Sequence, residues 1–383
     1  MKPEVGTSSP GGNSPMNALA IVPGQGSIHA IQRPEPDVTE PDQVKLQVLQ
    51  VGICGTDREE VSGGRAQAPD SKNELIIGHE MLGRVVEVGD QVTRVNPGDL
   101  AVFTVRRGCG RCLPCTMNRP DMCRTGDYFE RGIKGLDGYQ AEFVVDREPY
   151  VVRVPSELGT VAVLTEPLTI TEKAIDESIH IQNARLPDAP AHPDWLYDRP
   201  CLVAGIGAVG LLAALALRLR GARVFGLDIV DPDSSRPRWL EAIGGSYIDG
   251  RQVAPDRVDS KVGEMDLIFE ATGVAKLEFN LLDALGPNGI YVLTGIPGGD
   301  RPLEIAGAQL IRQLVLDNQL MLGSVNASRD HFQMAVDDLA HAQARWPGAV
   351  QQLITASHAW SDYEKAFASH ETDSIKTVIE WSK

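Results

Sequence analysis

Four cysteines within fifteen residues have the spacing of a metal site. Cys109, Cys112, Cys115 and Cys123 follow the pattern C-x2-C-x2-C-x7-C, which suits four thiolates around one zinc ion. The surrounding segment, 108–125, contains glycine, proline and arginine and lacks the alternating apolar pattern of a core. Four thiolate ligands leave no coordination position open for a substrate. We therefore expect a structural zinc here, so the chemistry must lie elsewhere in the chain.

Two motifs nearer the N-terminus contain another cysteine and a histidine. Cys54 lies in Gly-Ile-Cys-Gly-Thr-Asp, and His79 and Glu80 lie in Gly-His-Glu. Cys54, His79 and a carboxylate would make the three-ligand set of a catalytic zinc, with one position left for water or an alcohol. Taken singly, such residues are usually a core cysteine and a hydrogen-bonded histidine. Their order before the cysteine cluster and a glycine motif favours the catalytic interpretation.

The glycine motif predicts a dinucleotide site. It follows an apolar run at 201–204 and opens an apolar stretch at 209–219. In that context the glycines allow a tight turn and bring the backbone close to a pyrophosphate at the helix N-terminus. The alternative is a tight strand–helix turn without a ligand. The expected contact residues are Gly205, Ile206, Gly207, Ala208, Val209 and Gly210.

Asp228 ends the next apolar run and is placed to bind the adenosine ribose. Its carboxylate would accept a hydrogen bond from the 2′-hydroxyl and repel a 2′-phosphate, which favours NAD over NADP. Arg236 and Arg238 follow soon after and could soften that preference. The alternative role for Asp228 is to cap the following turn.

The elements that position these residues fall into two parts. A chain of 383 residues suits two domains. Short Val/Ile-rich runs between glycines and prolines predict a β-rich, barrel-like domain from Met16 to about Glu148. After about Pro200 strands and helices alternate, which predicts a doubly wound parallel sheet. The expected order is 201–204, 209–219, 223–228, 235–243, 266–270, 277–285, 290–294 and 320–325, followed by a helix at 329–344 and a strand at 374–381. A helical stretch at 164–181 and a linker at 186–200 join the two parts.

Composition and charge exclude several classes of protein. The formal charge of −16 argues against a surface that follows nucleic-acid phosphates. Met1–Pro15 lacks the apolar core of a secretory signal and is expected to be a disordered tail. The longest apolar stretch, Val209–Leu219, is too short to span a membrane. We therefore expect a cytoplasmic protein without nucleic-acid or membrane partners, in which clustered thiols bind metal and do not form disulfides.

Taken together, these motifs resemble the zinc-dependent medium-chain dehydrogenases from about residue 16 to the C-terminus. Three stretches, 130–138, 166–173 and 323–327, resemble the glucose 1-dehydrogenase branch of archaeal type. The resemblance implies a fold of the α/β plus β class. It consists of a GroES-like β-barrel catalytic domain, 16–186 and 327–383, and a Rossmann dinucleotide-binding domain, 187–326.

The resemblance also implies roles for individual residues. The catalytic zinc would be surrounded by Cys54, His79, Glu80 and Glu166, with Asp57 orienting His79. The sugar would be contacted by Thr56, Glu130, Glu166 and Asn326, with Thr56 also carrying the proton away. The dinucleotide would also be contacted by Leu293, Thr294, Gly295, Ser324, Val325 and Asn326. Three alternatives stay open: Glu80 hydrogen-bonds a neighbour, Glu130 makes a loop ion pair, and Asn326 caps a helix that begins near Arg329.

The reaction implied is oxidation of an aldose at C1 to the aldonolactone, with D-glucose, D-galactose or D-xylose as substrate. NAD is expected as the preferred cofactor with NADP possible, with two zinc ions per chain in a homodimer or homotetramer. The chain departs from the branch at Ile170, where an acidic sugar contact is common, and at 228–230, where NADP-using members carry arginines. The alternatives are a polyol or secondary-alcohol dehydrogenase, a zinc-ribbon scaffold or nucleic-acid module, and a relative that binds nucleotide without turnover.

Overall fold

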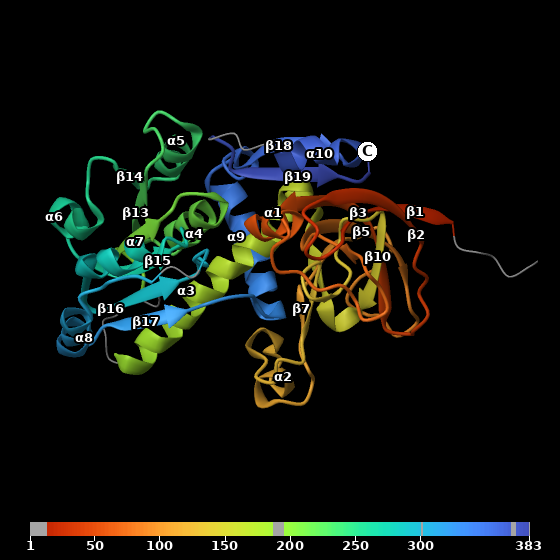
Figure 1. Ribbon diagram of the computed structural model, residues 1–383, viewed down its shortest axis with the longest axis horizontal. Helices are drawn as coiled ribbons and strands as arrows, with labels where there is room; N and C mark the ends of the chain where they lie inside the picture. The colour runs from red at the N-terminus through yellow and green to blue at the C-terminus, as the bar shows by residue number, and fades with distance from the viewer. Residues whose placement is uncertain (1–13, 187–194, 300–301, 369–372, 383) are drawn as a thin grey trace, which may run out of the picture. The chain divides into compact units, whose positions relative to one another are not determined.

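The computed structural model describes residues 14–186, 195–299, 302–368 and 373–382 (Figure 1). The chain forms two compact units. The first contains the residues up to Phe103, Phe129–Arg153 and the residues from Ile379 onward. The second contains Thr104–Tyr128 and Val154–Val378. The chain therefore enters the second unit twice, first with the four-cysteine segment and later with the alternating strands and helices.

The first unit is built mainly from β-strands. β1 pairs with β2 and β4, while the larger sheet contains the order β11-β6-β5-β3-β19, and β10 also pairs with β3. The single α-helix among its described residues is α1 (Gly55–Val61). Its strands are β1 (Pro15–Ile21), β2 (Ile28–Pro34), β3 (Gln43–Ile53), β4 (Leu75–Ile76), β5 (Glu80–Val88), β6 (Leu100–Phe103), β8 (Phe129–Arg131), β9 (Gly135–Leu136), β10 (Phe143–Arg147), β11 (Val151–Val154) and the end of β19 (Lys376–Glu380).

The pairing of β3 with β5 brings two distant motifs together. The strands are antiparallel, and Gly52 lies opposite Glu80. In an antiparallel pair the end of one strand lies beside the start of the other. The residues that follow β3 therefore meet those at the start of β5. Val44, Leu46 and Val48 of β3 are buried and hold this register, because alternate side chains share one face of a strand.

The second unit contains the predicted parallel sheet. Its strand order is β14-β13-β12-β15-β16-β17, and each neighbouring pair is parallel. Numbered along the chain this order is 3-2-1-4-5-6, the doubly wound arrangement whose ligand crevice lies beside the first strand. The strands are β12 (Pro200–Ala204), β13 (Arg223–Asp228), β14 (Ser246–Asp249), β15 (Met265–Glu270), β16 (Leu285–Leu293) and β17 (Leu320–Gly323), with β7 (Arg106–Arg107) and β18 (Ile354–Ala359) outside this sheet.

Helices pack around this sheet, and the longest of them, α3, packs against α4 and α9. Helix α4 is almost wholly apolar, with eight buried residues, which is the composition of a helix enclosed by a sheet and other helices. The α-helices are α2 (Leu113–Thr116), α3 (Thr165–Arg185), α4 (Ala208–Leu219), α5 (Ser235–Ala242), α6 (Val258–Val262), α7 (Ala275–Asn280), α8 (Gly307–Leu316), α9 (Arg329–Arg345) and α10 (Tyr363–Ala368). Short 3-10 helices include η1 (Pro120–Met122), η3 (Ser156–Leu164) and η5 (Leu281–Ala284).

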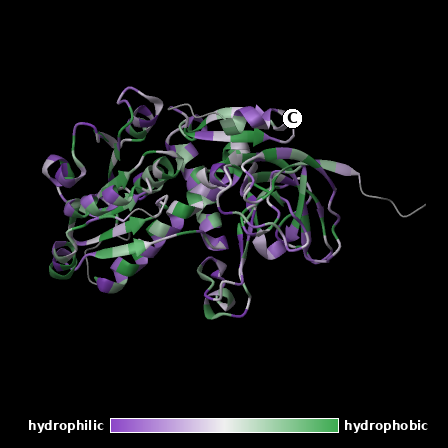
Figure 2. Ribbon diagram, in the orientation of Figure 1, coloured by the Kyte–Doolittle hydropathy of each residue, from purple (hydrophilic) through white to green (hydrophobic). Residues whose placement is uncertain are grey.

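The core of the second unit explains why its strands read as continuous apolar runs. Both faces of a parallel sheet are covered, so its strands need not alternate. Leu202, Ile268 and Tyr291, from three neighbouring strands, are fully buried in one cluster. Figure 2 shows these strands in the colours of hydrophobic residues. Among the helices of the described residues, none combines the length and the apolarity that a membrane span requires.

The predicted elements differ from the structure at several boundaries. The helix expected at 277–285 is divided into α7 and η5, and Leu285 already begins β16, because Gly-Pro-Asn-Gly at 286–289 does not suit a helix. The strand expected at 320–325 ends at Gly323, and helix α8 was not foreseen. Pro15, placed in the tail, belongs to β1, while residues 1–13 and most of the expected linker lie outside the described residues. The domain boundaries given above remain a prediction.

Candidate active site

Cys54, His79 and Glu80 come together in the first unit. One ligand atom from each lies within 4.8 Å of the other two. Cys54 follows β3 and is half-buried, whereas His79 and Glu80 at the start of β5 are 5% and 1% exposed. A thiolate, an imidazole and a carboxylate form a donor set that zinc takes in catalytic sites. These three residues therefore fit a zinc ion that keeps a position free for substrate.

Asp57 lies beside the histidine. Cys54 is the N-cap of α1, and its backbone N–H donates to Oδ2 of Asp57 over 2.7 Å. The other carboxylate oxygen lies 3.4 Å from Nδ1 of His79, and Asp57 is completely buried. A carboxylate facing one ring nitrogen directs the other ring nitrogen toward a metal. This arrangement supports the predicted orienting role of Asp57.

Glu80 is accommodated by the glycine across the strand pair. A Cβ atom on residue 52 would overlap the Glu80 carboxylate, so a residue with a side chain there would displace the carboxylate. Only glycine leaves this space. The motif Gly-Ile-Cys at 52–54 therefore does two things: it supplies a sulfur ligand and makes room for a neighbouring carboxylate. Whether Glu80 binds the metal or a neighbour remains a prediction.

Charge is concentrated around this site. Burial alone lowers the pKa of His79, but the Asp57 carboxylate and Cys54 raise it by more, so it lies well above the usual value. Glu60, also on α1, was not identified from the sequence. It is 2% exposed, and burial, followed by the charge of Asp57, raises its pKa to about 9. The available signal was its spacing of three residues from Asp57, which places both on one helix face.

The other predicted residues of the first unit are Thr56 and Glu130. Thr56 lies in the first turn of α1, half-buried and two residues after Cys54. Glu130 lies in β8, also half-buried, where its backbone N–H donates to the carbonyl of Lys134. The sugar contacts assigned to both residues remain predictions.

The four cysteines of the lobe 104–128 form a compact thiol cluster in the second unit. Their sulfur atoms lie within 4.8 Å of one another, with 3.9 Å between Cys109 and Cys115 and 4.0 Å between Cys112 and Cys123. Tetrahedral zinc with Zn–S bonds of about 2.3 Å separates its sulfurs by about 3.8 Å. Leu113 on α2 and Met117, which follows this helix, are 66% and 65% exposed, so they supply no core. The residues fit a zinc ion that takes the place of a core.

The glycine motif forms the turn from β12 into α4. Gly207 is the N-cap of α4, so the first backbone N–H groups of that helix face the end of the sheet, where an anion binds. A Cβ atom on residue 210 would overlap the carbonyl oxygen of Gly205. Glycine at 210 therefore lets the helix pack closely against the strand, as dinucleotide-binding turns require.

Asp228 lies at the tip of β13, beside this turn. Its Oδ2 accepts a hydrogen bond from the backbone N–H of Ile206 over 2.9 Å, and Oδ1 accepts one from Ile229 over 2.7 Å. The first bond ties the carboxylate to the glycine turn, where a dinucleotide ribose is expected. The second bond, from Ile229, is the turn-capping contact given above as the alternative role of Asp228. The carboxylate therefore contacts the glycine turn and caps its own turn at the same time.

Two further segments meet at the end of the parallel sheet. Thr294, which follows β16, donates from its hydroxyl to the carbonyl of Glu270 over 2.7 Å, and Gly295 N–H donates to a Glu270 carboxylate oxygen over 3.2 Å. Ser324, which follows β17, donates from its N–H to the carbonyl of Leu293 over 2.9 Å. The hydroxyl of Ser324 is buried and has no hydrogen-bond partner among the described residues. That donor fits a ligand at this end of the sheet.

Asn326 lies two residues before the N-cap of the next helix. Ser328 is the N-cap of α9, in a capping box with His331. Asn326 has a left-handed backbone (φ 62°), and its Oδ1 accepts from the N–H of Ala327. Both the helix-capping alternative for Asn326 and its sugar contact remain predictions.

Glu166 lies in the first turn of α3, within the second unit. It is 8% exposed, and its carbonyl accepts a hydrogen bond from the hydroxyl of Thr169. Ile170 is half-buried on the same helix. Both the metal and the sugar contacts assigned to Glu166 remain predictions.

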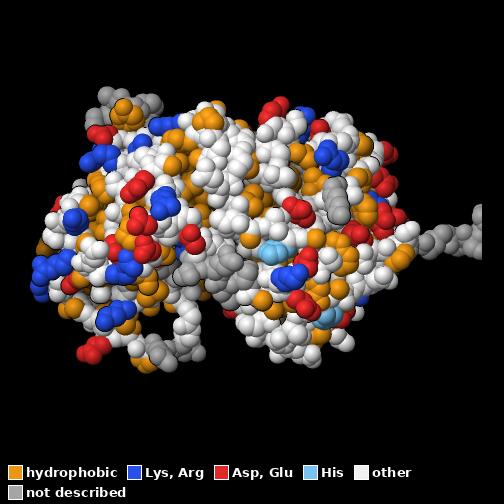
Figure 3. Space-filling model, turned by 90° about the horizontal axis from the view of Figure 1, so that it is seen from above, with side chains coloured by type: hydrophobic (Ala, Val, Ile, Leu, Met, Phe, Trp, Pro, Cys, Tyr) orange, Lys and Arg blue, Asp and Glu red, His pale blue; other side chains and the backbone are white. Residues whose placement is uncertain are grey.

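The surface carries charges of both signs. Acidic and basic side chains are interspersed on the face shown in Figure 3. Among the residues coloured there, no continuous basic stripe follows this face. Nucleic-acid binders usually concentrate basic side chains on the binding face, so this face gives no support to the nucleic-acid alternative.

Comparison with known proteins assigns the family. Residues 159–381 match the model of the glucose dehydrogenase C-terminus, and residues 40–156 match the alcohol dehydrogenase GroES-like domain. Glucose 1-dehydrogenase 2 of Vulcanisaeta moutnovskia is 38% identical over 367 residues, which covers 95% of this chain and 99% of that protein. Glucose 1-dehydrogenase of Methanocella arvoryzae is 36% identical over 369 residues, with 95% and 99% covered.

A solved structure agrees with these sequence matches. Glucose dehydrogenase of Haloferax mediterranei, in complex with NADP, Zn and gluconolactone, superposes with a TM-score of 0.85 at 32% identity, covering 96% of this chain and all of that one. The resemblance inferred from the motifs, and with it the GroES-like and Rossmann fold class, is confirmed. This chain belongs to the glucose dehydrogenase family of zinc-dependent medium-chain dehydrogenases.

Proposed function

We propose that this chain oxidises D-glucose at C1 to the aldonolactone, with NAD(P) as the hydride acceptor. The observation that carries the proposal is the grouping of Cys54, His79 and Glu80 within 4.8 Å of one another. A site with this donor set suits the oxidation of an alcohol. The relatives named glucose 1-dehydrogenase and the gluconolactone in the Haloferax complex support a sugar as the substrate class.

Several of the predicted residues are assigned a task in this reaction. When bound, zinc supplies Lewis-acid polarisation that lowers the pKa of a coordinated hydroxyl. The hydroxyl of Thr56, in the first turn of α1, takes the proton from the C1 hydroxyl and passes it to solvent. Asp57 holds His79 in one ring orientation, and the space at Gly52 keeps the Glu80 carboxylate in place. Glu80 and Glu166 would be the two carboxylates available to hold the zinc ion.

The sugar is recognised through hydroxyl contacts to Glu130, Glu166 and Asn326. Charged or amide groups that bind a sugar hydroxyl discriminate against analogues that lack it. The side chain of Ile170 cannot form a hydrogen bond. This chain therefore lacks the acidic sugar contact that is common at this position in the branch. We therefore propose that D-galactose and D-xylose are accepted as well as D-glucose.

We propose that NAD is preferred over NADP. The support is Asp228, whose carboxylate is tied to the N–H of Ile206 and would meet a 2′-phosphate with like charge. Against it stands the NADP in the Haloferax complex. Arg236 and Arg238 follow Asp228 in this chain and could bind a 2′-phosphate.

The metal content, assembly and compartment complete the proposal. The two thiol-containing clusters support two zinc ions per chain. A homodimer or homotetramer in the cytoplasm, without a nucleic-acid partner, follows from the resemblance and the acidic composition.

The test is an initial-rate panel of D-glucose, D-galactose, D-xylose and simple polyols, each with NAD and with NADP. We expect reduction of the dinucleotide with the aldoses and a higher kcat/KM with NAD. A polyol that reacts while no aldose does would overturn the sugar assignment and favour a polyol dehydrogenase. A higher kcat/KM with NADP would overturn the cofactor preference alone.

A further inference from the structure

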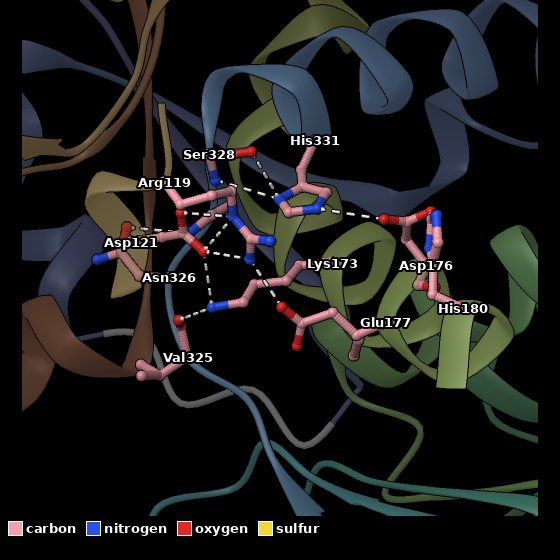
Figure 4. A network of polar contacts seen from close by, with 12 residues as sticks. Arg119, Asp121, Lys173, Asp176, Glu177, His180, Val325, Asn326, Ser328 and His331 are labelled. Atoms are coloured by element: carbon pink, nitrogen blue, oxygen red, sulfur yellow. Dashed lines mark hydrogen bonds and ion pairs between the residues drawn. The ribbon is translucent and has the colours of Figure 1, made fainter. Parts of the chain in front are cut away.

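One buried lysine of α3 connects two segments of the second unit that are far apart in sequence. Lys173 Nζ lies 3.0 Å from Oδ2 of Asp121 and donates a hydrogen bond of 2.9 Å to the carbonyl oxygen of Val325 (Figure 4). The lysine side chain is 4% exposed and Asp121 is completely buried. Asp121 precedes Cys123 by two residues, and Val325 precedes Asn326. The cysteine lobe and the segment after β17 thus share one cation.

Asp121 is held firmly on the side of the lobe. Arg119 donates to both of its carboxylate oxygens, over 3.0 and 2.8 Å, and Arg106 donates to its backbone carbonyl over 2.6 Å. Arg119 also donates to Glu177 on α3 over 2.7 Å. Glu177 lies one helical turn after Lys173, so the lobe contacts the same face of α3 twice. Removing one partner of a buried, hydrogen-bonded ion pair strongly lowers the stability of the fold. The contacts of Asp121 with Arg119 and Lys173 are therefore expected to stay formed.

The segment 324–326 follows the end of β17, where the N–H of Ser324 donates to the carbonyl of Leu293. β17 ends at Gly323, the Val325 side chain is 54% exposed, and Asn326 is left-handed. Beyond it, Ser328 N–H donates to Nδ1 of His331, whose Nε2 lies 3.7 Å from Asp176 of α3. Figure 4 shows the lysine contact at Val325 and the serine–histidine contact farther along the chain, at Ser328.

We propose that Lys173 is a positioning residue for the segment 324–326, and that Asp121 of the cysteine lobe acts through Lys173. The inference rests on the proposed function, in which Ser324, Val325 and Asn326 contact dinucleotide and sugar. Lys173 fixes the Val325 carbonyl and thereby the peptide that carries Asn326. The lobe, which supplies no group to the reaction, therefore influences how tightly the ligands bind.

The test compares Lys173→Met with Lys173→Arg in the zinc-loaded protein. Methionine retains most of the stem but removes the charged donor, and loss of such a hydrogen bond disfavours the ordered arrangement of the segment 324–326 by roughly tenfold or more. We expect Lys173→Met to raise KM for dinucleotide and sugar by about that factor with a smaller change in kcat, and Lys173→Arg to recover part of it. An unchanged KM in Lys173→Met would overturn the proposal.

Asp121→Asn tests whether Asp121 acts through Lys173. Alone it should raise KM, and in the Lys173→Met background it should add little, because the lysine it orients is gone. Fully additive effects would contradict this part. The matched control is Arg111→Ala in the same lobe, since Arg111 pairs with Asp127 in an exposed ion pair; an equal rise in KM there would also overturn the proposal.

Hydrogen exchange separates this proposal from the proposed function. Lys173→Met should accelerate amide exchange in the peptide 320–328 relative to wild type, whereas Arg111→Ala should not. If wild type fails to oxidise any aldose, the proposed function falls, while exchange and NADH binding by fluorescence still judge the role of Lys173. Unchanged exchange and unchanged NADH affinity in Lys173→Met would overturn it. Asp121→Asn and Lys173→Arg, which retain the shape of the site, decide the matter if Lys173→Met fails to fold.

Discussion

At the scale of single residues, the two cysteines outside the lobe have contrasting surroundings. Cys54 is half-buried at the N-cap of α1, within reach of His79 and Glu80. Cys201 is completely buried in β12 among apolar residues. The potential metal clusters found among the described residues include Cys54 and not Cys201. Of these two cysteines, only Cys54 is placed to bind a metal ion.

Replacing Cys54 by alanine should abolish turnover and leave the fold intact. A catalytic metal supplies several kcal/mol of stabilisation, so kcat should fall about a thousandfold or more. Zinc analysis, initial rates and thermal unfolding together check the prediction, with one zinc ion fewer per chain expected. Cys201→Ala is the control and should keep both zinc ions and the activity. A Cys54→Ala protein that melts far below wild type would show a structural role instead.

The grouping of Cys54, His79 and Glu80 could be predicted because each stands in a short motif whose order is informative. Cys54 and His79 were identified without knowing that Gly52 pairs with Glu80. Glu60 could not be found in the same way. It stands in the charged run Arg-Glu-Glu at 58–60, which usually indicates a solvated helix face, and only tertiary packing buries it.

At the scale of elements, α3 carries an unusual number of buried charges. Glu172 and Lys173 are 0% and 3% exposed on neighbouring positions of this helix. The sequence predicted a helix at 164–181, and the structure extends it to Arg185. Its buried charges could not be predicted, because they depend on partners from α4, α9 and the cysteine lobe. Arg220, after α4, pairs with both Glu172 and Asp338, each over 2.7 Å.

Glu172 should make stability depend on pH. Burial, opposed by Arg220 and reinforced by Asp338, raises its pKa from 4.5 to about 8. A carboxyl whose pKa is raised in the folded state contributes stability that is complete below pH 4.5 and is lost as pH rises through about 8. Glutamine does not titrate, so Glu172→Gln should lose less stability over this range than wild type.

Thermal unfolding at pH 5, 6.5 and 8 measures this effect. The midpoint of Glu172→Gln relative to wild type should rise steadily from the lowest to the highest of these pH values. Glu157→Gln, which alters an exposed carboxylate, should follow wild type throughout. Parallel curves for Glu172→Gln and wild type would show that Glu172 is ionised in the folded protein at all three pH values.

At the scale of the whole molecule, the sequence was enough to predict the fold class. It did not predict which segments of the chain belong to the same compact unit. Alternating runs after Pro200 were enough to predict the doubly wound sheet, since parallel strands are buried on both faces. The lobe 104–128 is part of the same compact unit as that sheet. This grouping could not be predicted, because it depends on contacts such as Asp121–Lys173 between residues far apart in the chain.

The grouping predicts what loss of the lobe zinc will do. Structural zinc contributes folding free energy directly, because the ligands are not assembled in the unfolded chain. In Cys112→Ser, we expect one zinc ion fewer per chain and a lower unfolding midpoint for the unit that carries the parallel sheet. NAD is proposed to bind that unit, and a ligand at about one hundred times its Kd stabilises the folded state by about 2.7 kcal/mol.

Calorimetry with and without NAD identifies which unfolding transition belongs to that unit. The transition that NAD raises in wild type should be the one that Cys112→Ser lowers. Cys54→Ala, which also lacks one zinc ion but from the first unit, should leave this transition in place. If the NAD-sensitive transition of Cys112→Ser coincides with that of wild type, the lobe zinc does not stabilise the nucleotide-binding unit, and the lobe folds independently of it.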